Sequence, residues 1–258
     1  MRKQLIAFDL DGTLAPSKSP LPDRIASLLD GLLSSFKVCV ISGGKFEQFE
    51  KQLLANLTSD PEKLHNLHLM PTCGTQYYRY DVINKKWANV YREDLSPEQK
   101  KSVIKALNEG LDELNLREEK IYGELIEDRG SQMTLSVLGQ DIVDELGLEG
   151  VRLKEEWDPT NRKKEKLRAF VAPLIPDLEI KVGGLTSLDV TKPGIDKAYG
   201  MTKLMEELRI GMDEILFIGD RLQEGGNDYP VKAMGIDSLE ISSWQETAIA
   251  VQAILHVV

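Results

Sequence analysis

Short apolar runs alternate with amphipathic segments along the first 80 residues. Leu5–Phe8, Lys37–Ile41 and Leu67–Met70 each predict a short buried strand. Between the first two runs, apolar residues recur at the spacing of a helix with one apolar face: Ile25, Leu28, Leu29, Leu32 and Leu33. A second helix is predicted before the third run, from Phe46, Phe49, Leu53 and Leu57. This alternation favours a parallel sheet with right-handed crossover connections.

The middle of the chain has a different pattern, in which the predicted strands come in pairs. Gln76–Tyr80 and Trp87–Tyr91 predict a hairpin. Ser96 followed by Pro97 marks a helix start, because proline is favoured at the first helical position. Two more strand pairs and a charged helix are predicted at 121–127 with 132–138, 178–182 with 186–190, and about 161–174. Hairpins with interleaved helices indicate a separate α+β module.

The α/β pattern returns near Ile195, where apolar spacing predicts a helix through Met205. Predicted strands at 214–218 and 238–241 follow, and a helix closes the chain at 245–255. The pattern therefore predicts one α/β core domain, residues 1–83 and 187–258, interrupted by an inserted α+β domain over residues 84–186.

Composition narrows the class of protein. The 258 residues carry a formal net charge of −10, which argues against nucleic acid or an anionic membrane surface as a partner. No run approaches 18 apolar residues, so no membrane span is expected. Cys39 and Cys73 are the only cysteines, too few for a disulfide framework or a zinc site. Because the first apolar run ends at Asp9, a secretory signal is not expected either, and we predict a cytoplasmic location.

Two carboxylates stand at the carboxyl end of the first predicted strand. Asp9 and Asp11 are one residue apart, and Gly12 and Thr13 follow directly. Carboxylates are rarely buried unless they are paired or bound to metal. Ligands of open α/β sheets gather at this end of the strands. The run therefore predicts a metal and phosphate site.

Three further segments, distant in the chain, also have polar or charged residues at predicted strand ends or helix starts. Ser42 and Gly43 follow the second predicted strand, and Lys197 opens a helix. The fourth segment holds Asp220, Asn227 and Asp228 after the strand at 214–218. Strand ends of a parallel sheet share one edge, so these side chains are expected to meet there. Lys192 competes with Lys197 for the phosphate role, and Asp228 alone is equally typical of a helix N-cap.

These four segments, in this order, closely resemble the motifs of the haloacid dehalogenase superfamily. The inserted domain between the second and third motifs matches the class IIB branch, which includes eukaryotic-type phosphomannomutases and related sugar phosphatases. The resemblance covers essentially the whole chain. It implies a Rossmann-like α/β core with a parallel sheet and an inserted α+β cap of the C2B type.

The resemblance also implies roles for the core residues. Asp9 would be the nucleophile that forms an aspartyl-phosphate, and Asp11 the general acid and base. Mg²⁺ would be held by Asp9, the backbone carbonyl of Asp11 and Asp220, with Asn227 and Asp228 in support. The phosphoryl oxygens would be bound by Thr13, Ser42, Gly43 and Lys197.

On the cap, the resemblance implies that Arg129, Ser187 and Asp189 contact a small phosphorylated metabolite. Phosphomannomutases use further cap arginines for a second phosphate, but this chain has Gln140 and Val182 at two of those positions. It also has Asp220 where those mutases commonly carry asparagine. Since a mutase needs the second phosphate site, these departures favour hydrolysis.

The leading hypothesis is therefore a Mg²⁺-dependent phosphatase acting on a sugar phosphate. The alternative is a phosphomannomutase-like enzyme that interconverts hexose 1- and 6-phosphates. A catalytically silent sugar-phosphate binding protein is a third hypothesis, which the intact first motif opposes. A receiver-type signalling domain would be about half this length. Related mutases pair through their caps, so a homodimer through the cap is one expectation; the sequence leaves the oligomeric state and the physiological substrate open.

Overall fold

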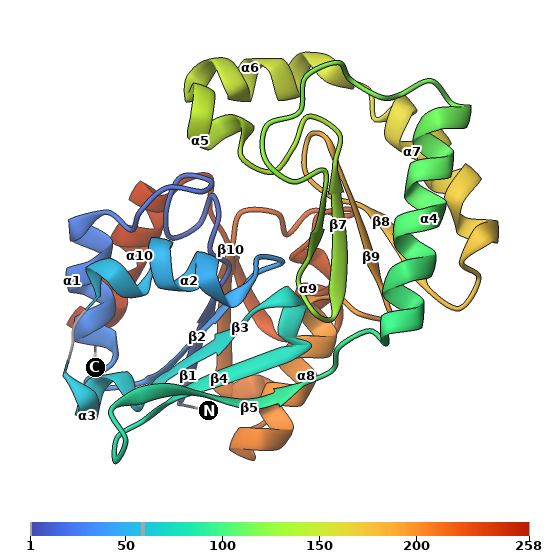
Figure 1. The fold of residues 1–258 in the computed structure, drawn as a ribbon. Helices are drawn as coiled ribbons and strands as arrows, with labels where there is room; N and C mark the ends of the chain where they lie inside the picture. Colours follow the sequence, from blue (N-terminus) through green and yellow to red (C-terminus); the bar gives the residue numbers. More distant parts are fainter. Residues whose placement is uncertain (1, 58–59, 258) are drawn as a thin grey trace. The chain divides into compact units, whose positions relative to one another are not determined.

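The computed structural model describes residues 2–57 and 60–257 and divides into two compact units. The first unit, the core, contains residues 1–92 and 195–258, and the second, the insertion, contains residues 93–194. Figure 1 shows both units with their helices and strands.

The core is built on a seven-stranded sheet with the order β11-β10-β1-β2-β3-β4-β5. The first five strands in this order are parallel, whereas β4 and β5 are antiparallel additions at one edge. The strands are β1 (Leu5–Phe8), β2 (Lys37–Ile41), β3 (Leu67–Met70), β4 (Gln76–Asp81), β5 (Lys86–Arg92), β10 (Ile215–Gly219) and β11 (Asp237–Glu240). The strands β1, β2 and β3 are buried almost throughout, which explains why they are nearly continuous apolar runs, whereas the edge strand β11 is largely exposed.

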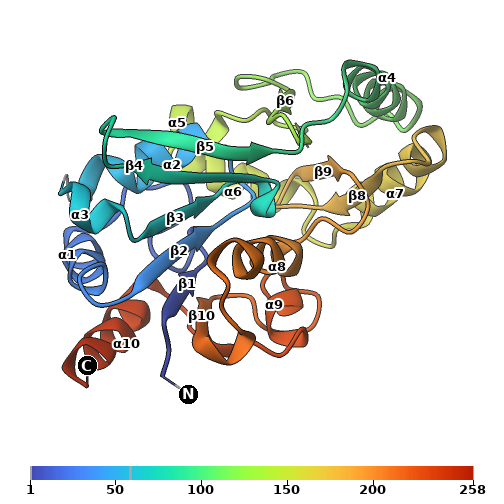
Figure 2. The same ribbon diagram turned by 90° about the horizontal axis from the view of Figure 1, so that it is seen from below.

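Helices cover both faces of the core sheet. Side chains such as Phe8 and Val40 pack towards one apolar cluster, and their neighbours Ala7 and Cys39 towards another. In the first cluster, α1 and α10 lie side by side although they come from opposite ends of the chain (Figure 1). Figure 2 shows α8 beside α9, which contribute to the second cluster. The core helices are α1 (Asp23–Leu32), α2 (Phe46–Gln52), α3 (Pro61–Leu64), α8 (Lys197–Leu208), α9 (Tyr229–Ala233) and α10 (Trp244–His256), with short 3₁₀ turns η1 (Leu54–Asn56), η2 (Thr72–Gly74) and η4 (Met212–Glu214).

The insertion contains a four-stranded antiparallel sheet with the order β6-β7-β9-β8. One face packs on α4 and α7, which lie side by side (Figure 1). The other face carries polar residues at alternate positions, because successive side chains of a strand point to opposite faces. Its elements are α4 (Pro97–Glu113), β6 (Ile126–Asp128), β7 (Gln132–Ser136), α5 (Ile142–Leu146), α6 (Leu148–Trp157), α7 (Arg162–Val171), η3 (Ala172–Leu174), β8 (Glu179–Val182) and β9 (Ser187–Thr191).

The mixed α/β fold with a second antiparallel sheet is as predicted, but the boundaries predicted at 84–186 are displaced. The structure places the hairpin β4–β5 in the core, because β4 pairs with β3 through His68 and Arg79. It places β9 in the insertion, because β9 pairs with both β7 and β8. The predicted limits passed through two hairpins that the sequence itself indicated, 76–80 with 87–91 and 178–182 with 186–190, and the structure keeps each hairpin within one unit.

Local predictions failed mainly in the insertion. The strand predicted over 121–127 is reduced to β6, and the helices α5 and α6 were not predicted. Gly147, at φ 58°, separates these two short helices. α5 has only five residues, and α6, although it has ten residues like α1, has a less distinct apolar face. Across the residues that the structure describes, no helix has the length and apolarity needed to span a membrane.

Candidate active site

Three of the predicted site residues of the core stand at the ends of neighbouring strands of the sheet. Asp9 directly follows β1, Asp220 directly follows β10, and Ser42 directly follows β2. β1 pairs in parallel with both β10 and β2, so the chain leaves β1 towards β2 and returns after the insertion to β10 on the other side. Ligands of open α/β sheets bind outside the carboxyl ends of strands at such a switch point.

Three carboxylates form a cluster at this edge. One oxygen from each of Asp9, Asp220 and Asp228 lies within 4.8 Å of the other two. Gly12 lets Asp220 approach, because a Cβ built on Gly12 would stand 2.5 Å from Asp220 Oδ2. Gly12 also has φ +89°, a conformation that side chains disfavour. A glycine is therefore required after the two aspartates, both for the backbone conformation of the turn and for the close approach of Asp220.

Lys197 supplies the positive charge of the cluster. Its side chain is buried, and its ammonium group contacts Asp9 Oδ1 and, at 2.5 Å, Asp228 Oδ1. Asp196 positions this lysine at the start of α8 by accepting the backbone N–H of Tyr199 at 2.9 Å. Lys192, the competing candidate, instead donates to the carbonyl of Glu93 within the insertion. The geometry therefore favours Lys197 for contact with the reacting group.

Burial and charge shift the acid–base equilibria of the cluster. Burial raises the pKa of Asp9 to about 7, and Asp228 adds to this effect whereas Lys197 opposes it. Burial and the charge of Asp228 also raise the pKa of Asp220. Burial alone would lower the pKa of Lys197, but the carboxylates of Asp9 and Asp228 raise it. Three carboxylates against one ammonium group leave an excess of negative charge that suits a divalent cation.

Two buried oxygens at the site lack a hydrogen-bond partner among the described residues. These atoms are Asp9 Oδ2 and Thr13 Oγ1. Buried polar atoms are normally paired, so such exceptions often mark a place for an ion or ligand. The Thr13 carbonyl accepts the hydroxyl of Thr247 at 2.7 Å, which ties this loop to α10. A carboxylate oxygen and a hydroxyl fit the predicted metal and phosphate roles, and an all-oxygen donor set fits Mg²⁺.

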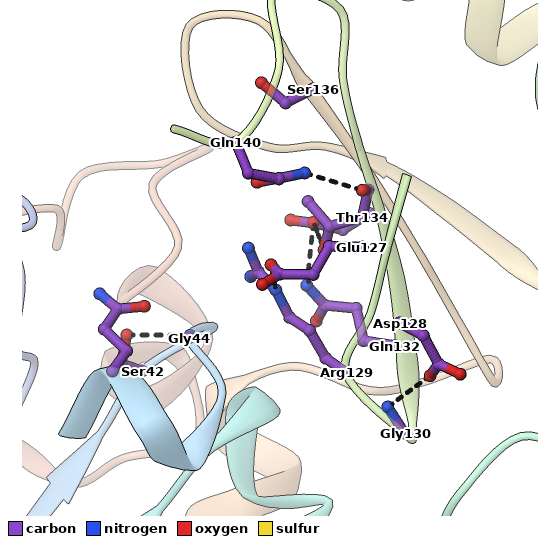
Figure 3. A network of polar contacts seen from close by, with 12 residues as sticks. Ser42, Gly44, Glu127, Asp128, Arg129, Gly130, Gln132, Thr134, Ser136 and Gln140 are labelled. Atoms are coloured by element: carbon purple, nitrogen blue, oxygen red, sulfur yellow. Dashed lines mark hydrogen bonds and ion pairs between the residues drawn. The ribbon is translucent and has the colours of Figure 1, made fainter. Parts of the chain in front are cut away.

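Ser42 and Gly43 lie at the end of β2. Ser42 is buried, and its hydroxyl oxygen accepts the backbone N–H of Gly44 at 3.2 Å (Figure 3). A Cβ built on Gly43 would have no other heavy atom within 4 Å, so Gly43 borders open space. This arrangement leaves room for a phosphoryl oxygen, which remains a prediction for both residues.

Asp11 is held apart from the three-carboxylate cluster by contacts with α2. Its carboxylate accepts the backbone N–H of Lys18 at 2.7 Å, the amide of Gln48 at 2.9 Å and the amide of Gln52 at 3.3 Å. The two glutamines were not among the predicted site residues. Their signal was available, since they lie four residues apart on a helix that follows the predicted phosphate loop.

Asn227 and Asp228 differ in their surroundings. Asp228 is buried and also accepts the backbone N–H of Arg221 at 3.1 Å. It stands at the N-cap of α9, but its side chain makes no capping hydrogen bond there. Asn227 is exposed, and no hydrogen bond joins its side chain to the cluster in the described part of the chain. Its supporting role at a metal remains a prediction.

Figure 3 shows Arg129 beside Glu127, Gln132 and Thr134, and the strand register places Asp189 opposite Thr134 and Ser187 opposite Ser136. Arg129 donates to Glu127 at 2.6 Å, and both side chains are largely buried. Asp189 Oδ1 accepts Gln132 Nε2 at 2.9 Å and Thr134 Oγ1 at 2.8 Å.

Burial raises the pKa of Asp189, and the charge of Arg129 opposes this shift. Ser187 lies opposite Ser136 in the register of β9 and β7. The structure therefore brings Arg129, Ser187 and Asp189 onto one polar sheet. Glu127, Gln132 and Thr134 were not predicted, although their alternation with apolar residues was visible in the sequence.

The folded core defines the class of protein. A structure of an IMP-bound IMP-nucleotidase from Plasmodium falciparum superposes with a TM-score of 0.68 at 19% identity, covering 100% of this chain and 68% of that one. A haloacid dehalogenase-like hydrolase from Bacteroides thetaiotaomicron gives a TM-score of 0.61 at 17% identity, covering 98% of this chain and 100% of that one. The chain therefore has the fold of the haloacid dehalogenase superfamily.

Sequence comparison identifies the family. The family model described as eukaryotic phosphomannomutase matches residues 25–256. A phosphomannomutase of Encephalitozoon cuniculi is 25% identical over 237 residues, covering 89% of this chain and 84% of the relative. Phosphomannomutase 1 of Mus musculus is 27% identical over 236 residues, covering 89% and 83%. The chain belongs to the eukaryotic phosphomannomutase family.

Proposed function

We propose that this protein is a Mg²⁺-dependent phosphotransferase that moves the phosphoryl group of a hexose phosphate through Asp9, acting as a phosphomutase. The observation that carries the proposal is the buried Asp9 held by Lys197 beside two further carboxylates. The relatives support the mutase reaction, because those compared above are named phosphomannomutase. They favour the phosphomutase hypothesis over the phosphatase hypothesis, which the sequence pattern had favoured.

The proposed reaction begins at Asp9. One of its carboxylate oxygens forms a bond to phosphorus, and the ester bond between phosphorus and the sugar oxygen breaks. The electron pair goes to the leaving oxygen, which takes a proton from Asp11. The reverse sequence, with another sugar hydroxyl as acceptor, returns the phosphoryl group to the opposite position of the hexose.

The charges around Asp9 fit this chemistry. Lys197 lies where it can neutralise the transferred phosphoryl group as well as Asp9. Mg²⁺ bound by Asp9, Asp220 and Asp228 would supply the charge that lets an anionic carboxylate approach an anionic phosphate. Ser42 and Thr13 would donate hydroxyl hydrogen bonds to phosphoryl oxygens.

Hydrolysis is the second candidate function, and the polar sheet of the insertion favours it. Arg129 is neutralised by Glu127 on that face. Gln140 and Val182 stand where the resemblance leads us to expect arginines, and the Gln140 amide donates to the carbonyl of Thr134 at 3.0 Å. A second phosphate would find fewer bidentate donors there, and water would then be the acceptor.

The two candidates are separated by following both products. Purified protein with Mg²⁺ and a trace of hexose 1,6-bisphosphate should interconvert mannose 1- and 6-phosphates much faster than it releases inorganic phosphate. Release of phosphate at the rate of substrate loss would select hydrolysis. No turnover of any phosphate ester, with or without Mg²⁺, would contradict both candidates.

Replacing Asp9 tests the shared chemistry. Asp9→Asn should lower turnover at least about 10³-fold while the protein stays folded, because the amide is a poor nucleophile and a poor metal ligand. Turnover is measured as kcat for the hexose phosphate, and circular dichroism checks that the variant is folded. Asp23→Asn, at an exposed carboxylate in the first turn of α1, is the matched control. Retained activity in Asp9→Asn would disprove the aspartyl-phosphate route.

A further inference from the structure

Two glutamines on one face of α2 contact the carboxylate of Asp11. Gln48 Nε2 lies 2.9 Å from Asp11 Oδ2, and Gln52 Nε2 lies 3.3 Å from Asp11 Oδ1. Residues four apart on a helix are neighbours on its surface, so one helix presents both amides together. From this geometry we infer that Gln48 and Gln52 are positioning residues, which orient Asp11 for proton transfer with the sugar oxygen. The inference rests on the proposed function, since it assigns a task to the same site.

The contacts fix both oxygens of Asp11. The backbone N–H of Lys18 donates to Oδ1 at 2.7 Å, so together with the glutamines three donors hold one carboxylate. Lys18 has φ 56°, a left-handed conformation that costs non-glycine residues about 1 kcal/mol or more. Such a conformation persists only where the surrounding contacts favour it. The loop from Gly12 to Ser19 is therefore shaped to meet Asp11.

The glutamines are themselves held in place. Gln48 Nε2 also donates to Gln52 Oε1 at 2.6 Å, and Gln52 Nε2 donates to the carbonyl of Ser19 at 3.0 Å. Gln52 is only 4% exposed. A buried amide with its partners satisfied has few alternative positions. The pair therefore forms a rigid support between α2 and Asp11.

Gly44 connects this support to the loop after β2. A Cβ built on Gly44 would stand 2.0 Å from Gln48 Oε1. Gln48 can take its position only because residue 44 has no side chain. The loop that contains Ser42 and Gly43 thus also provides the space that Gln48 needs.

The amide group is chemically suited to an acid–base partner. An amide offers N–H donors to a carboxylate and a carbonyl acceptor to a carboxylic acid. As placed, both glutamines donate to Asp11, so the contacts hold its ionised form, the state that Asp11 reaches after giving up its proton. In the proposed step the Asp11 proton passes to the sugar oxygen as that oxygen leaves phosphorus.

A purely structural role would have a different effect from a positioning role. If the glutamines only hold the loop over residues 12–19 closed, their replacement should lower kcat/KM equally for all substrates. If they orient Asp11, their replacement should lower kcat/KM only for substrates whose leaving oxygen needs a proton. An aryl oxide such as p-nitrophenolate leaves without one, whereas a sugar alkoxide does not.

The experiment compares kcat/KM for a hexose phosphate and for p-nitrophenyl phosphate. Gln48→Met and Gln52→Met should each lower the value for the hexose phosphate about 10-fold or more and change the value for the aryl phosphate less than about 3-fold. Asp11→Asn should show the same selectivity with a larger loss of about 10²–10⁴-fold. Gln252→Met, at an exposed glutamine of α10, is the control and should match the wild type with both substrates.

Thermal unfolding of each variant accompanies the kinetics. Gln48 is less buried than Gln52, so Gln48→Met tests the inference even if Gln52→Met does not fold. Equal losses with both substrates, or no loss with either while Asp11→Asn remains selective, would overturn the positioning role. Activity retained in Asp9→Asn would instead overturn the proposed function.

Discussion

Lys197 allows Asp9 and Asp228 to be buried side by side. Its ammonium group contacts one oxygen of each carboxylate, and all three side chains are nearly inaccessible to solvent. Removing one partner from such a group leaves an uncompensated buried charge. The resulting loss in the free energy of unfolding is far larger than the net stabilisation that the intact ion pair provides. The residue that we propose to contact the phosphoryl group is therefore also one that the folded core requires.

Asp9 and Asp220 were identifiable from the sequence because each follows an apolar strand directly. Local sequence did not decide between Lys192 and Lys197. The two lysines lie five residues apart, and only the folded chain shows that one faces Asp9 and the other the carbonyl of Glu93. Gln48 and Gln52 were missed because glutamines four residues apart are common on helices. Their place after the predicted phosphate loop was the available signal, but their shared contact with Asp11 is apparent only in three dimensions.

His68 is a buried imidazole away from the proposed site. It is 2% exposed, and its Nδ1 lies 2.7 Å from the hydroxyl of Tyr77. Burial lowers the pKa of His68 to about 3, with a further contribution from the charge of Arg79. Burial also raises the pKa of Tyr77. The pair is therefore neutral across the physiological range.

This burial predicts a pH-dependent stability. Because the folded pKa of His68 lies below the unfolded value of about 6.5, the unfolded chain binds the proton first as pH falls. The stabilising contribution is complete above pH 6.5 and is lost between pH 6.5 and 3, at up to about 1.4 kcal/mol per pH unit. Urea unfolding at several pH values measures it.

His68→Gln is the comparison, since glutamine can still accept from Tyr77 but does not titrate. Its free energy of unfolding should fall less steeply between pH 6.5 and 4.5 than that of the wild type. Parallel slopes for the two proteins would show that His68 is protonated in the folded state as readily as in the unfolded chain.

At the level of elements, α4 begins with a complete capping box. The Ser96 hydroxyl accepts the N–H of Gln99 at 3.2 Å, and the Gln99 side chain accepts the N–H of Ser96 at 2.9 Å. Pro97 occupies the first helical position. These residues made this helix start predictable from sequence. α5 and α6 were missed because their starts carry fewer signals: Asp141 precedes α5 without a following proline or capping-box partner, and α6 begins directly after Gly147.

Ser96→Ala should destabilise the insertion. Loss of an N-cap hydroxyl costs about 1 kcal/mol, because the N–H of Gln99 loses its partner. Chemical denaturation followed by circular dichroism measures the change. Ser102→Ala, at an exposed position within the same helix, serves as the control and should change stability by less than about 0.5 kcal/mol. Equal effects of the two substitutions would argue against a specific contribution of the cap.

At the level of the whole molecule, the fold class followed from the alternation of strands and helices, whereas the domain limits did not. The predicted limits cut through the hairpins β4–β5 and β8–β9, each of which lies within one unit. The pairing of β9 with β7, which is distant in the chain, depends on tertiary contacts that no local pattern contains. The family model matches residues 25–256, which contain the second, third and fourth predicted motifs.

Mg²⁺ should stabilise the whole protein against unfolding. The carboxylates of Asp9, Asp220 and Asp228 are brought together only in the folded state, so the cation binds that state in preference. At a concentration 100 times the dissociation constant, the gain is about 2.7 kcal/mol. Thermal unfolding with Mg²⁺ and with EDTA measures it. In Asp220→Asn the gain should shrink markedly, and a shift of the same size in that variant would point to a different binding position.

The central strand β1 has partners from both ends of the chain: β2 comes soon after it, whereas β10 follows the insertion. A chain emerging from the ribosome must therefore expose one edge of β1, together with Asp9, while the residues between Phe8 and Ile215 are synthesised. The insertion holds its own sheet and apolar cluster, so it can fold during this wait. The complete site can therefore form only late in synthesis, when β10 pairs with β1 and Lys197, Asp220 and Asp228 come together with Asp9. A chain interrupted before that point would have no functioning site, even though most of its mass had been made.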